Sequence, residues 1–323
     1  MEKPKLAIYW AASCGGCDIA ILDIEDAILT VADFFDLCLW PCAADFKYKD
    51  IEAMPDKSIT LTLFNGAIRS NENYHIAQLL RKKSVVLVAF GSCASEGCIP
   101  GLANFTTLDG IMKYAYKESP STDNPEGIYP QCVTKVPEGE ITIPKLWNTV
   151  RTLSQCVDVD YIIPGCPPQS DQIAAVVGAV IDILKNGKPL PEKGTVLGAT
   201  DKTCCDECPR VRDVKKIKNF TRSFLIDVDP EICLMEQGLV CLGPATRGGC
   251  GAKCVQAGVP CRGCYGIPMN VRDQGAKMVS AIASVIDSEE PKEIEKIIDT
   301  IADPLGTFYR FSLPDSMLRR VQL

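Results

Sequence analysis

The chain has 323 residues, enough for two domains of ordinary size, and its composition of 46% hydrophobic and 23% charged residues indicates a substantial folded core. The net charge of -7 argues against nucleic acid as a partner, because phosphate binding favours an excess of Lys and Arg. Residues 1–10 run into an apolar segment without a signal peptide or twin-arginine motif. No apolar stretch reaches the roughly 18 residues that span a bilayer. We therefore expect a cytoplasmic protein without membrane insertion.

The chain contains 18 cysteines and a single histidine, His75. This cysteine density lies below the roughly 8–10% of secreted disulfide scaffolds, which are also mostly short chains. In a reducing cytoplasm thiols stay free, so metal binding or redox chemistry is the better interpretation. Thiolates without imidazole select zinc, copper(I) or iron–sulfur clusters.

The first 190 or so residues alternate between strand and helix patterns. Buried strands joined by helical crossovers are typical of an α/β fold with a doubly wound parallel sheet, and such sheets bind ligands at the carboxyl ends of their strands. The predicted strands are Lys5–Trp10, Leu37–Trp40, Ile59–Phe64, Val85–Phe90 and Val159–Ile163. The predicted helices are Asp18–Phe34, Glu72–Lys83, Leu108–Tyr116 and Ser170–Lys185.

Two segments interrupt this alternation. Residues 117–147 are rich in Pro, Ser, Thr, Glu and Gly, which predicts a long surface insertion and a candidate partner contact. Residues 187–200 have the composition of a linker. Beyond the linker regular structure becomes sparse and cysteines become dense, apart from a charged amphipathic helix expected over Asp287–Ala302. We therefore predict a first domain over residues 1–190 and a small irregular domain over residues 191–323.

Four cysteines follow the carboxyl ends of predicted strands. Cys14 and Cys17 lie in the loop after the first strand, Cys93 follows Val85–Phe90, and Cys166 follows Val159–Ile163. On its own the C-x-x-C pair would also suit a thioredoxin-like redox site or a zinc knuckle. The matching positions of Cys93 and Cys166 favour one site with four thiolates, in which the flanking glycines let backbone amides approach bridging sulfides.

The stretch from Cys204 to Cys264 holds nine of the 18 cysteines. Two further sets of four can be read from the spacing: Cys205, Cys208, Cys233 and Cys241, then Cys250, Cys254, Cys261 and Cys264. Either set could bind zinc. The segment has little sequence with which to build independent zinc-finger folds. Two all-cysteine sites next to a third therefore favour a relay of iron–sulfur clusters.

The order C-x-x-C, G-x-C, P-G-C-P-P, C-x-x-C, C, C and C-R-G-C resembles the small subunit of [NiFe] hydrogenases over nearly the whole chain. The chain is most similar to the cytoplasmic, methyl-viologen-reducing type that associates with heterodisulfide reductase in methanogens. Segments that carry this likeness are residues 124–127, 159–168, 241–250, 260–264 and 303–314.

The resemblance implies a flavodoxin-like domain followed by a small irregular iron–sulfur cluster domain, with three [4Fe–4S] clusters in all. It would assign Cys14, Cys17, Cys93 and Cys166 to the proximal cluster. It would assign Cys250, Cys254, Cys261 and Cys264 to the medial cluster, and Cys205, Cys208, Cys233 and Cys241 to the distal cluster.

The resemblance also implies a division of labour between subunits. The nickel–iron site lies in a partner large subunit, so no catalytic residue is assigned to this chain. Electrons from H2 would pass through the proximal, medial and distal clusters to an iron–sulfur or flavin subunit of a heterodisulfide reductase complex. A small iron–sulfur subunit of the delta type would be a further partner.

Three positions depart from the usual family pattern. Many small subunits have a histidine as the first distal ligand, where Cys205 stands here, although the adjacent Cys204 could take its place. Many have only three medial cysteines and a [3Fe–4S] cluster, whereas Cys254 supplies a fourth here. Full thiolate ligation favours lower potentials. A glutamate often follows the proximal C-x-x-C pair, and Asp18 lies directly after Cys17, which leaves a role in proton transfer open.

Three other functions fit parts of the pattern. A deazaflavin-reducing hydrogenase shares the architecture, and its acceptor subunit would tell it apart. The related cluster subunit of complex I has one cluster site, which the dense second group of cysteines opposes. A zinc-stapled interaction protein would be distinguished by its metal content. The remaining cysteines are interpreted as small buried hydrophobes, and His75 as a helix residue rather than a ligand. These cysteines are Cys38, Cys42, Cys98, Cys132 and Cys156.

Overall fold

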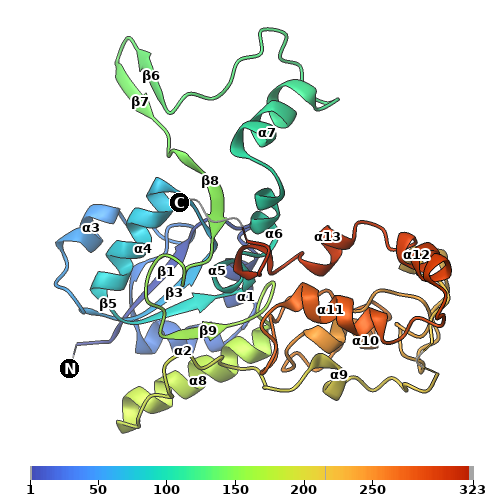
Figure 1. Ribbon diagram of the computed structural model, residues 1–323. Coiled ribbons are helices and arrows are strands. Elements are labelled where there is room, and N and C mark those ends of the chain that lie inside the picture. Colours follow the sequence, from blue (N-terminus) through green and yellow to red (C-terminus); the bar gives the residue numbers. More distant parts are fainter. Residues whose placement is uncertain (1, 215, 320–323) are drawn as a thin grey trace.

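The computed structural model describes residues 2–214 and 216–319 (Figure 1). A five-stranded parallel sheet with the order β2-β1-β3-β5-β9 forms the centre of the first domain. This is the strand order of flavodoxin-like sheets, and it confirms the predicted α/β fold. All five predicted strands are present, the first with the predicted ends and the other four with shifted ends. They are β1 Lys5–Trp10, β2 Asp36–Leu39, β3 Ile59–Asn65, β5 Ser84–Phe90 and β9 Tyr161–Ile163.

The register brings the carboxyl ends of the central strands level with one another. Trp10 pairs with Asn65, and Asn65 pairs with Phe90. The loops that follow β1 and β5 therefore leave the sheet at the same edge, and these are the loops that carry Cys14, Cys17 and Cys93.

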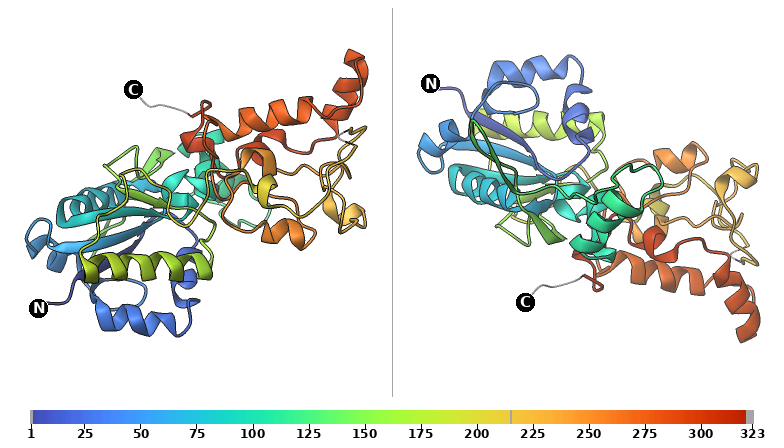
Figure 2. Two further views of the ribbon diagram at one scale, coloured as in Figure 1. Left: turned by 90° about the horizontal axis from the view of Figure 1, so that it is seen from below. Right: turned by 90° about the horizontal axis from the view of Figure 1, so that it is seen from above.

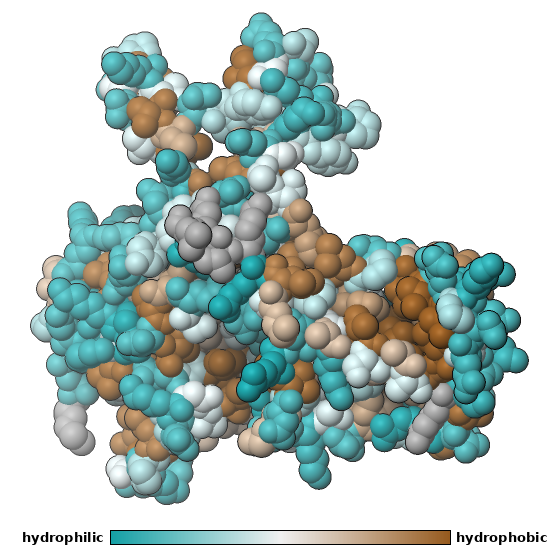
Figure 3. Space-filling model, in the orientation of Figure 1, coloured by the Kyte–Doolittle hydropathy of each residue, from teal (hydrophilic) through white to brown (hydrophobic). Residues whose placement is uncertain are grey.

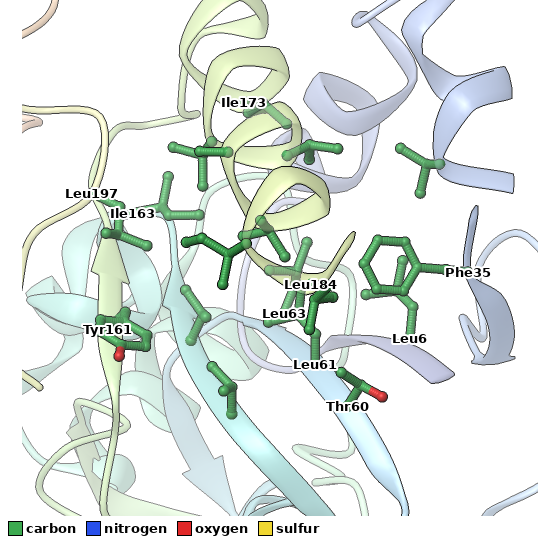
Figure 4. Close-up of a pocket in the computed structure, with 18 of the residues that line it drawn as sticks. Leu6, Phe35, Thr60, Leu61, Leu63, Tyr161, Ile163, Ile173, Leu184 and Leu197 are labelled. Atoms are coloured by element: carbon green, nitrogen blue, oxygen red, sulfur yellow. The ribbon is translucent and has the colours of Figure 1, made fainter. Parts of the chain in front are cut away.

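Helices cover both faces of the sheet (Figure 2). One face packs its apolar side chains against α1 (Gly16–Leu22), α2 (Ala27–Phe34) and α8 (Ser170–Asn186), and the other packs against α3 (Tyr48–Ala53) and α4 (Asn71–Lys83). The helix α8 covers its face incompletely. A cavity of about 680 Å³ remains between α8 and the sheet, and Figure 4 shows its apolar lining, including Leu61, Leu63 and Ile163.

The single helix predicted over Asp18–Phe34 is wrong, because the structure has two helices there. These are α1 (Gly16–Leu22) and α2 (Ala27–Phe34). Between them Glu25 has a positive φ of 54°, a conformation that ends a helix. The turn keeps Ile24 buried at 7% exposure. Helical periodicity continues across the break, which is why the sequence pattern does not reveal it.

The predicted surface insertion projects from the domain as an arm (Figure 1). The arm begins earlier than the predicted insertion over residues 117–147, with α7 (Leu108–Lys113) and its π-helical extension η2 (Tyr114–Glu118). It also contains the antiparallel hairpin of β6 (Val133–Val136) and β7 (Gly139–Thr142). The arm returns through β8 (Leu146–Arg151), which pairs with β4 (Ile68–Ser70). The sequence pattern did not predict the hairpin, whose side chains are almost all exposed.

The second domain consists of short helices around the cysteines. They are α9 (Cys204–Glu207), η3 (Ser223–Leu225), η4 (Gly243–Ala245), α10 (Lys253–Gln256), α11 (Gln274–Ala283), α12 (Pro291–Asp299) and α13 (Pro304–Phe308). The charged helix predicted over Asp287–Ala302 corresponds to the shorter α12. Several cysteine side chains pack inside the apolar core of this domain, among them Cys204, Cys241 and Cys261.

The end of the described chain returns to the first domain. The segment before and within η5 (Leu313–Asp315) lies against α5 (Ser92–Ser95), α6 (Cys98–Gly101) and η1 (Leu102–Phe105). The amide of Cys98 donates to the carbonyl of Phe311 over 2.9 Å, and Gln155 Nε2 donates to the carbonyl of Pro314 over 2.8 Å. Within the described residues, no helix is both long and apolar enough to cross a membrane.

Candidate metal centres

The structure brings the four cysteines of the predicted proximal set together at the carboxyl edge of the sheet. Cys14 follows β1, Cys17 lies in the first turn of α1, Cys93 lies in α5 after β5, and Cys166 follows β9. Burial raises the pKa of the Cys17 thiol, and the nearby sulfur atoms of Cys93 and Cys166 raise it further. Four sulfur donors from three strand ends therefore converge on one place.

Glycines allow these loops to approach one another. Gly91, with φ of +82°, directly precedes α5, and a Cβ at this position would lie 2.4 Å from Cys17 Sγ. A Cβ on Gly16 would lie 3.3 Å from Cys14 Sγ. Any side chain at position 91 would displace a sulfur of the site, so the site requires glycine there.

A fifth cysteine belongs to the same place. Cys98 is fully buried, as expected from the sequence, but its Sγ lies 3.6 Å from Cys166 Sγ and it also forms a hydrogen bond with Cys93. The hydrogen bond from Cys98 lowers the pKa of Cys166 to about 7. In the sequence, the one indication that Cys98 belongs to this site is its position five residues after Cys93 and directly after Gly97.

Asp18 is buried beside Cys17 at 3% exposure. Its carboxylate accepts hydrogen bonds from Trp40 Nε1 over 2.9 Å, Asn65 Nδ2 over 2.5 Å and Cys42 Sγ over 3.3 Å. These three contacts fix the orientation of the Asp18 side chain. The arrangement therefore holds a carboxylate next to the proximal cysteines. Cys42 and Cys132 are exposed residues and not buried hydrophobes, so their interpretation from the sequence was wrong.

Three of the four cysteines of the predicted distal set line a cavity of about 460 Å³ in the second domain. Cys205, Cys233 and Cys241 line this cavity together with Arg212 and Lys277. Burial raises the pKa of Cys205 to about 12, a rise that Arg212 opposes and that Cys233 and Cys208 increase. A Cβ on Gly243 would lie 2.8 Å from Cys205 Sγ, so this glycine also serves a close approach.

The predicted medial set also converges. Burial raises the pKa of Cys264, and Cys261, Cys250 and Cys254 are among the neighbouring thiols that raise it further. Cys204 joins this set and not the distal one. It forms hydrogen bonds with Cys250 and Cys261, and its hydrogen bond lowers the pKa of Cys250 to about 6. Successive residues of a helix point in directions about 100° apart, so Cys204 and Cys205 face different sites.

The medial set lies between the other two sets. On one side Ser92 Oγ donates a hydrogen bond to the carbonyl of Cys264, and Cys166 contributes to the raised pKa of Cys264. On the other side the amide of Cys261 donates to Cys241 Sγ over 3.3 Å. The three sets therefore form a continuous series from the sheet edge into the second domain.

The donors suit iron–sulfur clusters. Each set offers thiols alone, and thiolates are the usual ligands of [4Fe–4S] clusters. His75 is 62% exposed on α4, where it approaches Glu52 at 3.5 Å, away from every set. Across residues 2–214 and 216–319, no three Cys, His, Asp or Glu side chains have the geometry of a site for a single metal ion.

A polar cavity between the domains was not expected from the sequence. It has a volume of about 200 Å³ and is lined by Glu96, Arg247, Asp273, Gln274 and Asp315 among others. Burial raises the pKa of Glu96 to about 8. Nothing in the spacing of the chain indicated that Glu96, just after α5, would meet residues of α11 here.

Comparison with known proteins identifies the family. Residues 14–180 match the model of the NADH ubiquinone oxidoreductase 20 kDa subunit family. The iron–sulfur subunit of the F420-non-reducing hydrogenase of Archaeoglobus profundus is 39% identical over 98% of this chain and 98% of its own length. The corresponding subunit of the F420-non-reducing hydrogenase of Methanothermobacter marburgensis is 35% identical over 98% of this chain and 96% of its own length.

A solved structure supports the fold. One chain of the reduced, active Ni-Fe-Se hydrogenase of Desulfomicrobium baculatum superimposes with a TM-score of 0.53 and 16% identity, covering 89% of this chain and all of that chain. The match of the family model ends near the end of α8, whereas the two relatives match through the cysteine-rich second domain as well. The chain therefore belongs to the family of F420-non-reducing hydrogenase iron–sulfur subunits, which are small, electron-transferring subunits of [NiFe] hydrogenases.

Proposed function

We propose that this small subunit conducts electrons between the nickel–iron site of its large subunit and an acceptor subunit through three [4Fe–4S] clusters. In this proposal the proximal cluster is bound by Cys14, Cys17, Cys93 and Cys166. The medial cluster is bound by Cys250, Cys254, Cys261 and Cys264, and the distal cluster by Cys205, Cys208, Cys233 and Cys241. The observation that carries the proposal is the continuous series of cysteine sets from the sheet edge into the second domain.

Each bound cluster supplies a one-electron acceptor and donor. The chain's own residues do the rest. The cysteines would fix the positions of the clusters. Gly91 has no side chain, so it leaves room for Cys17 Sγ at the proximal site. The bond between Ser92 and Cys264, and that between Cys261 and Cys241, hold neighbouring sites against one another. Fixed spacing of this kind suits electron transfer, because no residue has to move between steps.

The absence of histidine from the cysteine sets supports low potentials. In Rieske centres imidazole ligation raises the potential of a cluster well above that of thiolate-ligated relatives. The Cys205 side chain stands where many small subunits have histidine, and Cys254 adds a fourth medial thiol. Both features favour cluster reduction potentials close to that of the H⁺/H2 couple.

Exposed apolar side chains near the distal set support an acceptor protein there. Val211, Phe224, Leu225 and Ile232 are 61%, 80%, 64% and 41% exposed, and they lie in segments that flank Cys208 and Cys233. Figure 3 shows further apolar side chains on the surface of the second domain. A patch of this kind marks a protein interface. We propose an iron–sulfur delta-type subunit as the acceptor, which would pass electrons to a heterodisulfide reductase. The cysteine content supports a cytoplasmic location for the complex.

Metal analysis tests the proposal. Iron, zinc and acid-labile sulfide are measured on the complex purified without oxygen, with EPR spectra of the reduced protein. This chain should contribute about twelve iron and twelve sulfide, the content of three cubanes. Stoichiometric zinc in place of iron would contradict the proposed electron-transfer function. It would favour the alternative, an interaction protein whose fold is stabilised by zinc. A redox titration showing a high-potential medial centre would contradict the low-potential relay.

A further inference from the structure

The cavity at the distal cysteines also carries two cationic side chains. Arg212 and Lys277 line it together with three cysteines of the distal set. Among the described residues of the lining, Glu236 is the one carboxylate. A cluster bound by these cysteines would therefore lie next to more positive than negative charge.

Backbone hydrogen bonds hold Arg212 at the cavity from both sides. The amide of Cys233 donates to the carbonyl of Val211 over 2.8 Å, which ties the residue before Arg212 to a distal cysteine. On the other side, the amide of Asp213 donates to Glu236 Oε2 over 3.1 Å. The segment of Arg212 is therefore fixed directly beside the distal set.

Lys277 reaches the same cavity from a different element, the helix α11. The start of this helix is capped by Asp273, whose Oδ1 accepts the amide of Ala276 over 2.7 Å. The residues that α11 and its C-terminal cap present to the cavity are Lys277, Ser280, Ala281 and Ser284. Their spacing of three, four and seven residues is that of one helix face. Two separately anchored elements thus supply the two cations.

The two cations have no other evident role in the fold. Both side chains are exposed, and neither forms a salt bridge with any residue in the described part of the chain. Arg210, two positions before Arg212, differs in this respect. It is buried at 5% exposure, and its guanidinium donates to the carbonyls of Val255 and Ile232, each over 2.9 Å. Arg210 therefore stabilises the fold, whereas the charge of Arg212 faces the cavity.

The proximal set has the opposite charge beside it. The carboxylate of Asp18 directly follows Cys17 and is 3% exposed. It is held by Trp40 Nε1 over 2.9 Å and by Asn65 Nδ2 over 2.5 Å, which are both neutral donors. The charge next to the cysteines therefore changes from negative at the sheet edge to positive at the far end of the series.

We propose that Arg212 and Lys277 raise the reduction potential of the distal cluster and so draw electrons toward the acceptor end of the relay. The inference rests on the proposed function, because it presumes a cluster at the distal cysteines. A reduced cluster carries one more negative charge than an oxidised one, so a nearby cation stabilises the reduced form. One electron leaves the medial site and enters the distal site, and no bond forms or breaks. Asp18 disfavours reduction at the proximal site for the same electrostatic reason.

A redox titration followed by EPR tests the inference on the purified hydrogenase complex. Arg212→Gln and Lys277→Gln should each move the midpoint of one cluster signal to a more negative potential, and the double variant should move it further. At the wild-type midpoint, the ratio of reduced to oxidised cluster should fall on the order of tenfold for each charge, as expected for a separation of about 10 Å at an effective dielectric constant of about 20. Because both side chains are exposed, added salt should reduce the shift.

Two further variants serve as controls. Arg212→Lys keeps the charge and should keep the wild-type midpoint. Lys216→Gln removes a charge from the same segment, but Lys216 lies outside the described lining of the cavity and pairs with Asp287 at 2.9 Å, so this variant should shift the midpoint less. Iron content and the other two EPR signals check that each variant is folded.

Two results would overturn the inference. One is a double variant with full iron and three unmoved midpoints. The other is a shift in Lys216→Gln as large as that in Arg212→Gln, which would show that net charge and not the cavity sets the potential. A wild type without iron and sulfide would instead overturn the proposed function.

Discussion

Replacing Gly91 with alanine should remove the proximal cluster. The new Cβ would lie 2.4 Å from Cys17 Sγ, whereas non-bonded heavy atoms rest at about 3.5–4.0 Å, so the two groups must separate by more than about 1 Å. Cys17 cannot yield easily, since it is buried at 6% exposure in the first turn of α1. The backbone at Gly91 (φ 82°, ψ 161°) also lies in a region that only glycine tolerates, which adds about 1–3 kcal/mol.

Gly187→Ala provides the matched control. Gly187 also has positive φ, 62°, at the end of α8, but nothing lies within 4 Å of its Cβ position. This variant should lose about 1 kcal/mol of stability and no iron. Gly91→Ala should lose about four iron and four sulfide together with the proximal EPR signal. If Gly91→Ala keeps full iron and an unchanged proximal signal, Cys17 is not a ligand held by this close approach.

Three further predictions follow from other contacts. Burial raises the pKa of Glu96 from 4.5 to about 8, so the folded protein binds this proton more tightly than the unfolded chain. As the pH rises from 4.5 to about 8, the free energy of unfolding should therefore fall by up to about 1.4 kcal/mol per pH unit. In Glu96→Gln the unfolding midpoint should change less over this pH range than in the wild type. Arg81→Ala removes the 2.6 Å partner of Asp160, a carboxylate that is 3% exposed. Asp160 keeps Lys193 at 2.7 Å, so the variant should lose only one charged hydrogen bond, about 1.5–3 kcal/mol in denaturant unfolding. Lys82→Ala on the same helix should cost under about 0.5 kcal/mol, and equal losses would contradict the role of the buried pair. Deleting residues 120–144 of the arm should leave iron content unchanged but reduce co-purification of partner subunits, and full co-purification would show that the arm makes no contact.

The fold was largely readable from the sequence because a parallel sheet is built from short, continuous apolar runs. Each of the five runs became a strand, and the residues after β1, β5 and β9 carry the proximal cysteines. Parallel strands place their carboxyl ends together, so convergence of Cys14, Cys17, Cys93 and Cys166 followed from topology.

The parts that were missed depend on contacts between distant segments. The break at Glu25 keeps apolar spacing intact, so no periodic signal marks it. Cys204 and Cys205 are neighbours in sequence, and only the anchoring of α9 through Thr203 and Glu207 decides which site each one faces. Cys98 meets Cys166 because α6 is held by Phe311, more than two hundred positions away.

The return of residues 309–316 to the first domain has a consequence for the order of folding. Phe311 receives the amide of Cys98, and Pro314 lies so close that a Cβ on Gly97 would meet it at 2.3 Å. Contacts between segments so far apart in the chain must overcome the entropy of closing a long loop. The strands of the parallel sheet pair over much shorter separations. The neighbourhood of the proximal cysteines should therefore close late in folding, after the sheet has formed.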